Sequence, residues 1–262
     1  MGECDGRNAL VTGASRGIGA VIAQHLARAG ATVAVTARTL EPDPKYPGTL
    51  RETVEAIESA GGKAVAIKAD LSVPDDRERL IAEAEAAIGP LDILVNNAAV
   101  AFWVPTEQQT DKRYRLMFET MVHAPFHLSM LLLPGMRERG RGWILNVSSR
   151  ASFHPLGPPY EKIHATAGPG VYGMCKAALE RFTTALAAET HGAGIAVNAL
   201  SPWDVVATHG AETHDLVKYG TEPPELMGEA AVALCSGDPL RLTGRITYTQ
   251  SLLAELKRQP RL

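Results

Sequence analysis

The sequence predicts an α/β fold in which helices cover both faces of a seven-stranded parallel sheet. Two observations predict it. Short apolar runs alternate along the chain with longer stretches of helical periodicity. The runs are apolar throughout, which is typical of strands in a parallel sheet that is buried on both faces. With 45% hydrophobic residues and no linker-like stretch, residues 1–262 are expected to form a single domain.

Seven runs have the length and composition of strands. They are Ala9–Thr12, Thr32–Ala37, Ala64–Ala69, Leu91–Asn96, Trp143–Ser148, Ile195–Leu200 and Arg245–Thr249. Five stretches between them repeat apolar residues at helical spacing. These are Ile18–Ala29, Leu50–Ala60, Asp75–Ile88, Lys112–Leu133 and Tyr172–His191. Two proline-rich segments, Thr39–Gly48 and Phe153–Gly170, are expected to be loops. The second directly precedes Tyr172, so we expect it to wall a site there or to be an ordinary surface loop.

A glycine-rich turn lies between the first strand and the first helix. Gly13 permits a sharp turn, Gly17 lets the backbone approach a pyrophosphate, and Gly19 lets the helix pack closely on the strand. The amino end of that helix offers free N–H groups to phosphates. The spacing G-x-x-x-G-x-G is a weak signal alone, since many turns contain glycine. In its strand–turn–helix context it predicts a Rossmann-type, doubly wound dinucleotide-binding fold. The turn's candidate cofactor contacts are Gly13, Ser15, Arg16, Gly17, Ile18 and Gly19.

A second motif places a phenol and an ammonium one helical turn apart. Tyr172 and Lys176 are four residues apart, so a helix puts them on one face. A free tyrosine has a pKa near 10, and a nearby ammonium favours the phenolate and lowers that pKa. General acid–base catalysis needs a pKa near the working pH. The pair therefore suits proton exchange with an oxygen, whereas an isolated match of this kind would more often be a surface pair.

The motifs together resemble the classical short-chain dehydrogenase/reductase family. The matching residues occur in family order and span nearly the whole chain: Thr12–Gly19, Ala69–Leu71, Asn96–Ala99, Asn146–Ser149, Tyr172 with Lys176, and Asn198–Pro202. Each is common alone, but the ordered set is specific. A narrower likeness, carried by residues 37–49 and by Asn198–Pro202 with Thr208, is to the hydroxysteroid-dehydrogenase-like branch.

The resemblance implies roles for particular residues. Ser149 would hold the substrate oxygen while Tyr172 exchanges its proton, with Ser149 favoured over Ser148 by the family's motif register. Lys176 would also hydrogen-bond the nicotinamide ribose. The remaining candidate cofactor contacts are Asp70 and Leu71 near the adenine, Asn97 and Ala98 after the fourth strand, and Val205 and Thr208 over the nicotinamide. An exposed loop aspartate is the plain alternative for Asp70.

The end of the second strand bears on which nicotinamide cofactor is used. NAD enzymes usually place a carboxylate there to accept the ribose hydroxyls. Here the strand ends Ala37-Arg38, and no acid occurs before Glu41. Arg38 could bind a 2′-phosphate, with Arg16 as a second guanidinium. The sequence therefore predicts NADP, with NAD possible, although both arginines could simply be solvated.

Three residue patterns depart from the family. Met121 occupies the place of an asparagine that helps organise a proton-carrying water chain, and His123 is a candidate substitute. Pro202 is followed by Trp203 instead of glycine. Ser149 and Tyr172 are also separated by a longer loop than is usual. We therefore expect slower turnover or another proton route, and a reshaped substrate pocket.

Composition argues against several other classes. The net charge of −3 gives no electrostatic reason to expect binding to nucleic acid or to an anionic membrane. No apolar run approaches the ~20 residues that span a bilayer. Cys4, Cys175 and Cys235 lack metal-ligand spacing, so no metal site is predicted. Without an apolar signal segment at the start, cytoplasmic residence with reduced thiols is expected.

The leading functional hypothesis is an NADP-dependent oxidoreductase acting on a carbonyl or secondary alcohol, with Tyr172 as the general acid/base. The alternative is a dinucleotide-binding sensor or scaffold with weak activity, motivated by Met121 and Trp203. A methyl donor-binding enzyme would share the sheet but gives no reason for Tyr172 and Lys176. A homodimer or homotetramer is expected from an apolar helix face, unless these side chains are ordinary core: Phe126, Leu128, Met130, Leu131, Leu132 and Leu133.

Overall fold

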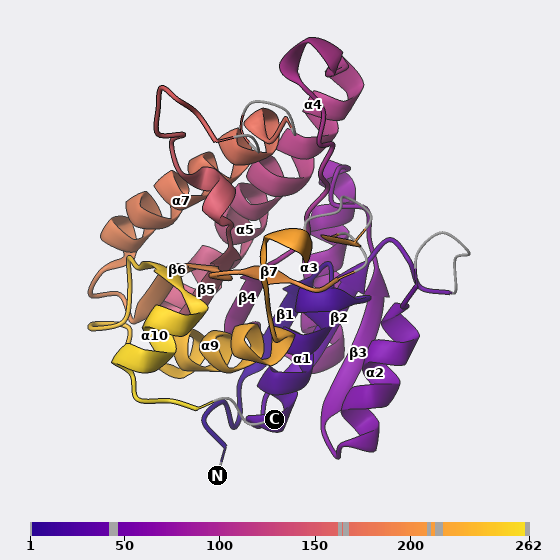
Figure 1. Cartoon of the computed structure of the whole chain (residues 1–262). Coiled ribbons are helices and arrows are strands. Elements are labelled where there is room, and N and C mark those ends of the chain that lie inside the picture. Colours follow the sequence, from indigo (N-terminus) through magenta and orange to yellow (C-terminus); the bar gives the residue numbers. More distant parts are fainter. Residues whose placement is uncertain are drawn as a thin grey trace.

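A seven-stranded parallel sheet forms the centre of the protein (Figure 1). The computed structural model describes residues 2–41, 47–161, 164, 168–208, 211–212 and 217–259. The strands are β1 (Asn8–Thr12), β2 (Thr32–Ala37), β3 (Lys63–Lys68), β4 (Ile93–Asn96), β5 (Gly142–Val147), β6 (Ile195–Ser201) and β9 (Ile246–Tyr248). Each corresponds to a predicted strand, with bounds that differ by at most two residues. The predicted fold class is confirmed.

The strand order is β3-β2-β1-β4-β5-β6-β9, and every pairing is parallel. The chain therefore runs outward from β1 in one direction and then, from β4, in the other. In open sheets of this kind, ligands bind in the crevice beyond the carboxyl ends of the strands where the order reverses. That crevice lies at the ends of β1 and β4, beside Thr12 and Asn96.

Helices pack on both faces of the sheet, each over its own hydrophobic core. One layer contains α1 (Gly17–Arg28), α2 (Leu50–Ser59), α9 (Pro224–Ser236) and α10 (Thr249–Glu255). The other layer contains α3 (Pro74–Ile88), α5 (Ala124–Arg139) and α7 (Gly170–Thr190). Consecutive strand residues point to opposite faces, so Leu10 and Val11, for example, belong to different cores. The apolar strands of the sequence are thus explained by burial on both faces.

Helix α9 is the largest element that the sequence pattern did not predict. Nine consecutive residues from Met227 to Cys235 are buried, because α9 packs on α1 and on the sheet together. A helix enclosed on all sides has no polar stripe, so its 3.6-residue period is not visible in the sequence. Gly228 permits the close packing, since a Cβ there would lie 2.4 Å from the His25 ring.

The predicted helix Lys112–Leu133 is longer and is interrupted by a π-helix. It consists of α4 (Asp111–Phe118), the π-helix η2 (Glu119–His123) and α5, which continues through Pro134 and ends at Arg139, with Gly140 as the C-cap. By length and composition, Asp111–Arg139 could cross a membrane, contrary to the expectation from the apolar runs. This is weak support for a membrane span, because a helix that covers one face of a sheet meets the same criteria. In its most apolar stretch, 39% is buried inside the protein.

Short elements complete the described part of the chain at the carboxyl edge of the sheet. The strands β7 (Val205–Val206) and β8 (Thr221–Glu222) form a separate two-stranded pair. The 3₁₀ helices are η1 (Thr106–Gln108), η3 (Arg150–Ser152) and η4 (Val217–Tyr219). Parts of both predicted loops, residues 42–46, 162–163 and 165–167, lie outside the described residues.

Candidate active site

The glycine turn joins β1 to α1 with two residues in left-handed backbone conformation. Gly13 has φ +65° and Gly17 has φ +57°, and both values favour glycine. Gly19 is required for another reason, since a Cβ there would lie 2.4 Å from Nδ2 of Asn97 and 2.5 Å from the Gly13 carbonyl oxygen. Gly19 therefore makes room for an asparagine side chain as well as for the turn itself.

Asn97 and Thr12 brace this turn. Nδ2 of Asn97 donates to the carbonyl oxygens of Thr12 (2.8 Å) and Gly13 (3.1 Å). In return, Oγ1 of Thr12 accepts from the backbone N–H groups of Asn97 (3.0 Å) and Ala98 (3.1 Å). These bonds hold the ends of β1 and β4 together. Two predicted cofactor contacts, Asn97 and Ala98, thus lie directly against the glycine turn.

The turn fits a dinucleotide pyrophosphate. The N-cap residue of α1 is Arg16, whose side chain makes no capping hydrogen bond, and a helix end without such a cap can offer its first N–H groups to phosphates. Ser15 is buried in the turn, and Ile18 is half-buried. Thr208, another predicted cofactor contact, lies over this turn. Its Cγ2 would be 3.2 Å from a Cβ on Gly17.

A hollow of about 400 Å³ lies at the ends of β2 and β3. Its lining includes Arg38 and Asp70, both predicted to contact the adenosine half of a dinucleotide. Oδ1 of Asp70 accepts from the backbone and hydroxyl of Ser72, which fixes its carboxylate at the rim. Arg38 is exposed and makes no hydrogen bond or ion pair within the described part of the chain. Leu71, in contrast, is buried in the core and is not among the residues that line the hollow.

Tyr172, Ser149 and Lys176 come together at the carboxyl end of β5. The Ser149 hydroxyl lies close enough to the Tyr172 phenol to lower its pKa through hydrogen bonding. Lys176 is 2% exposed, its Nζ donates to the Val147 carbonyl oxygen (2.7 Å), and Nζ lies 5.6 Å from the centroid of the Tyr172 ring. The three predicted catalytic side chains therefore form one cluster.

Burial dominates the pKa values of this cluster. Burial raises the pKa of the Tyr172 phenol to about 12, and the hydrogen bond with Ser149 offsets only part of this effect. Burial also lowers the pKa of Lys176 to about 8, although Cys175 and Glu180 act in the opposite direction. The structure thus differs from the sequence expectation that the ammonium would lower the phenol pKa, because desolvation is the larger effect.

Gly173 and Glu180 contribute to this arrangement and were not singled out from the sequence. A Cβ on Gly173 would lie 2.4 Å from the Ala151 carbonyl oxygen, so glycine lets α7 approach η3 and brings Tyr172 to Ser149. Oε1 of Glu180 accepts from the hydroxyls of Ser148 (2.7 Å) and Ser152 (2.8 Å). Ser148 is thereby turned toward Glu180, whereas Ser149 faces the phenol. The only sequence signals were Gly173 inside the Tyr–Lys motif and Glu180 one turn beyond Lys176.

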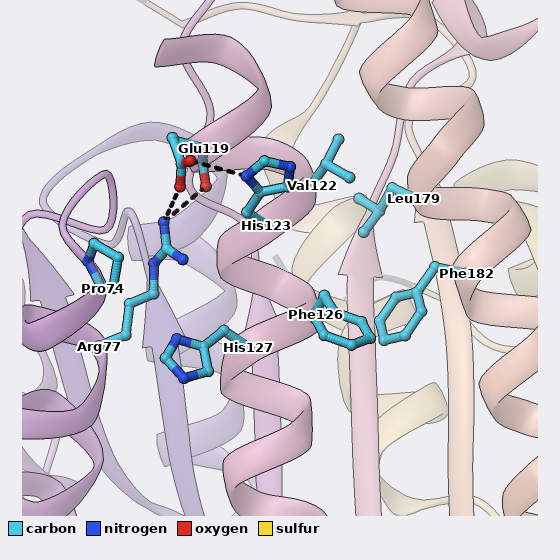
Figure 2. A pocket seen from close by; sticks show the side chains of 9 residues that line it. All are labelled: Pro74, Arg77, Glu119, Val122, His123, Phe126, His127, Leu179 and Phe182. Atoms are coloured by element: carbon cyan, nitrogen blue, oxygen red, sulfur yellow. Dashed lines mark hydrogen bonds and ion pairs between the residues drawn. The ribbon is translucent and has the colours of Figure 1, made fainter. Parts of the chain in front are cut away.

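Met121 and His123 lie on different sides of η2. Met121 is 1% exposed and packs in an apolar cluster against Tyr172, so it brings no polar group to the place of the family's asparagine. The suggestion that His123 substitutes for that asparagine is wrong. Its side chain is 55% exposed, and its Nδ1 is hydrogen-bonded to Glu119 (2.9 Å), a carboxylate that also pairs with the buried Arg77 of α3 (Figure 2).

Aromatic side chains flank both reacting groups. The Trp103 ring lies 5.6 Å from the Tyr172 ring, between centroids. Beyond Ser149, the Arg150 guanidinium stacks on the exposed ring of Trp203, 4.8 Å from its centroid. The end of the 153–170 loop also reaches this region, since a Cβ on Gly168 would lie 2.1 Å from the Val104 backbone. This contact of Gly168 supports the predicted position of the loop beside the active site, for the part of the loop that the structure describes.

Among the described residues, no group of three or more His, Cys, Asp or Glu side chains is placed to hold a metal ion. Cys4, Cys175 and Cys235 are buried and free.

Comparisons with known proteins agree with this geometry. A sequence model of the short chain dehydrogenase family matches residues 7–215. Hydroxysteroid dehydrogenase-like protein 2 from Xenopus tropicalis is 33% identical over 256 residues, covering 96% of this chain and 58% of that protein. The chain thus spans about three fifths of that relative's length.

Solved structures are also similar. A short chain dehydrogenase from Mycobacterium thermoresistibile has a TM-score of 0.83 and 31% identity, covering 97% of this chain and 88% of that one. A metagenomic short-chain oxidoreductase in complex with NADP has a TM-score of 0.76 and 28% identity, covering 94% and 98%. The family match extends over most of the sequence and the similar structures share its sheet, so the chain belongs to the short-chain dehydrogenase family, near its hydroxysteroid-dehydrogenase-like branch.

Proposed function

We propose that the protein is an NADP-dependent oxidoreductase that interconverts a carbonyl group and a secondary alcohol, with Tyr172 as the general acid/base. The observation that carries this proposal is the cluster of Ser149 and Tyr172 beside the buried Lys176, whose Nζ lies 5.6 Å from the centroid of the Tyr172 ring. This cluster lies at the same edge of the sheet as the glycine turn. A nicotinamide bound between them would supply or accept the hydride.

The residues of the chain handle the proton. The Ser149 hydroxyl hydrogen-bonds the substrate oxygen, and Tyr172 donates its proton to that oxygen as the carbonyl is reduced. With its pKa raised to about 12, the phenol is protonated at neutral pH. Carbonyl reduction needs the phenol in this protonated form, because the phenol is the proton donor. Lys176 in its ammonium form stabilises the developing phenolate, and by resemblance to the family it also holds the nicotinamide ribose.

Arg38 supports NADP over NAD. Its guanidinium is exposed at the rim of the hollow that Asp70 also lines, and β2 ends without a carboxylate that would repel a 2′-phosphate. Arg16, in the neighbouring turn, is the second predicted phosphate ligand. The bound NADP in the similar metagenomic oxidoreductase agrees with this choice.

The side chains around the reacting groups favour apolar substrates. Trp103 on one side and Trp203 with Phe153 on the other present aromatic surface near Tyr172 and Ser149. Burying an apolar substituent against such rings is favourable, whereas burying an unpaired polar group costs free energy. We therefore expect the carbonyl to carry an apolar or aromatic substituent.

Replacing the acid tests the proposal. Tyr172→Phe keeps the ring against Trp103 but removes the proton, so NADPH-dependent reduction of an aromatic carbonyl panel should fall by about a thousandfold. NADPH binding, measured by calorimetry, should stay within about threefold. Unchanged turnover would contradict the assignment of Tyr172.

A second candidate function is a dinucleotide sensor with weak activity. The buried Met121 favours it, because the family's proton-relay asparagine is replaced by an apolar side chain. This function predicts tight NADPH binding by the unaltered protein with only trace turnover across the carbonyl panel. The same panel therefore separates the two candidates.

We also propose that the protein forms homo-oligomers in the cytoplasm. Of the six residues expected on an apolar helix face, Leu128 and Leu132 lie in the core. Phe126 and Met130, however, are exposed. Phe126 borders a depression of about 550 Å³ between α3, η2, α5 and α7, with Phe182 beside it (Figure 2). Sedimentation equilibrium would measure the number of subunits.

A further inference from the structure

Glu222 is a buried carboxylate with several hydrogen-bond donors, and neither the proposed chemistry nor the glycine turn uses it. It lies in β8, is 3% exposed, and pairs with Val206 of β7. Carboxylates are rarely enclosed unless their oxygens are satisfied, so its partners indicate what it holds.

The partners of Glu222 come from two separate parts of the chain. Oε2 accepts from the backbone N–H groups of Trp203 (3.3 Å) and Asp204 (3.5 Å), just after β6. The hydroxyl of Thr249 lies 2.8 Å from Oε1 and 3.0 Å from Oε2, and Nε2 of Gln250 donates to Oε2 (3.3 Å). Each of these donors is neutral. The carboxylate thus joins the exit of β6 to the start of α10.

Thr249 closes this network. Its Oγ1 also accepts from the Trp203 N–H (3.2 Å), so Trp203 is held by the threonine and the carboxylate together. The Trp203 ring is held as well, edge-on by Tyr248 at 5.6 Å and by the stacked Arg150. Residue 203 is the one at which this chain departs from the family's glycine.

The held segment leads directly to the cofactor side of the site. Five residues after Trp203, Thr208 lies over the glycine turn, with Cγ2 3.2 Å from the Cβ position of Gly17. Between them, Val205 and Val206 pair with Thr221 and Glu222, so Glu222 anchors the segment at two points. A shift of this anchor would move Val205 and Thr208 away from the dinucleotide.

We propose that Glu222 is a positioning residue for the dinucleotide: it fixes the 203–208 segment over the glycine turn and so raises the affinity for NADP(H). This inference rests on the proposed function, because it assumes that the turn binds a nicotinamide dinucleotide. Since Glu222 touches the segment and not the reacting groups, its loss should weaken cofactor binding more than it slows the chemical step.

The test compares Glu222→Gln with the unaltered full chain in NADPH calorimetry and in steady-state reduction. Glutamine keeps the volume but turns an N–H group toward the donors that the carboxylate accepted, so we expect NADPH to bind at least tenfold more weakly. The kcat at saturating NADPH should stay within threefold. Glu255→Gln, an exposed carboxylate of α10 paired with Arg245, is the matched control and should change neither value.

A second variant tests the same inference in case Glu222→Gln fails to fold. Thr249→Val removes the hydroxyl that bridges Trp203 and Glu222 but keeps the side-chain shape, so it should weaken NADPH binding in the same direction by a smaller factor. NADPH affinities of both variants within twofold of the unaltered chain would overturn the inference, as would a loss of kcat at unchanged affinity. If the unaltered chain bound neither NADPH nor NADH, the proposed function would fail, and the inference with it.

Discussion

The two halves of this site are built by different means. The cofactor half consists of a short turn whose shape comes from glycine backbone conformations and from hydrogen bonds of Asn97 to that backbone. The substrate half consists of side chains that meet across long sequence separations, such as Trp103 with Tyr172 and Arg150 with Trp203. The first half depends on a few backbone positions, whereas the second depends on packing between loops.

This difference explains where the chain departs from its family. The glycine turn keeps the family pattern because each glycine meets a steric limit, shown by the close approach of Asn97 to Gly19. Trp203 and Met121 lie where side chains can change if their neighbours change with them. Arg150 and Tyr248 pack the Trp203 ring, and an apolar cluster encloses Met121. The substrate half is therefore the part that distinguishes this protein.

After the loss of the Tyr172 hydroxyl, the next largest expected effect would break the contact that assembles the substrate half. Gly173→Ala places a Cβ 2.4 Å from the Ala151 carbonyl oxygen, so α7 must move away from η3 and Tyr172 from Ser149. We expect kcat for carbonyl reduction to fall by about a hundredfold, because small misplacements of reacting groups are costly. NADPH affinity should change by less than threefold. Met174→Ala, at the exposed neighbouring position, is the control.

If Gly173→Ala kept full turnover, the close packing of α7 on η3 would not matter for catalysis. If it weakened NADPH binding as strongly as it slowed turnover, the two halves would not be separable in the way proposed here.

The pH dependence of reduction should be set by the substrate half. The Tyr172 phenol stays protonated up to its pKa of about 12, so it does not limit reduction at ordinary pH. Lys176 has its pKa lowered to about 8, and its ammonium is lost as the pH rises through that value. We expect kcat/KM for reduction to be level below pH 8 and to fall by up to about tenfold per pH unit above it. A profile level to pH 10 would contradict the need for the ammonium.

The smallest effect concerns cofactor choice. Arg38→Gln removes the exposed guanidinium at the end of β2, so NADPH should bind about tenfold more weakly, a typical loss for one charge-assisted hydrogen bond. NADH affinity should stay within twofold, because NADH has no 2′-phosphate. Calorimetric titration with both cofactors measures the difference, and Arg28→Gln at the exposed end of α1 is the control. Equal losses for both cofactors would contradict a phosphate contact.

The sequence by itself determined the seven parallel strands, the glycine turn and the pairing of Tyr172 with Lys176. These features are local: strand composition, positive φ at glycine and one helical turn are written within a few residues. Cofactor contacts that belong to a motif, such as Asn97, could be placed for the same reason.

Only the tertiary structure decided how the substrate half is built and how its groups titrate. The sequence could not indicate that burial is the largest influence on the Tyr172 pKa, because desolvation depends on everything packed around the phenol. It also suggested His123 as a relay residue, whereas the helix turns that side chain outward to Glu119. Helix α9 and the network of Glu222 were not visible, because complete burial removes periodicity and because hydrogen bonds between distant segments leave no spacing in the chain.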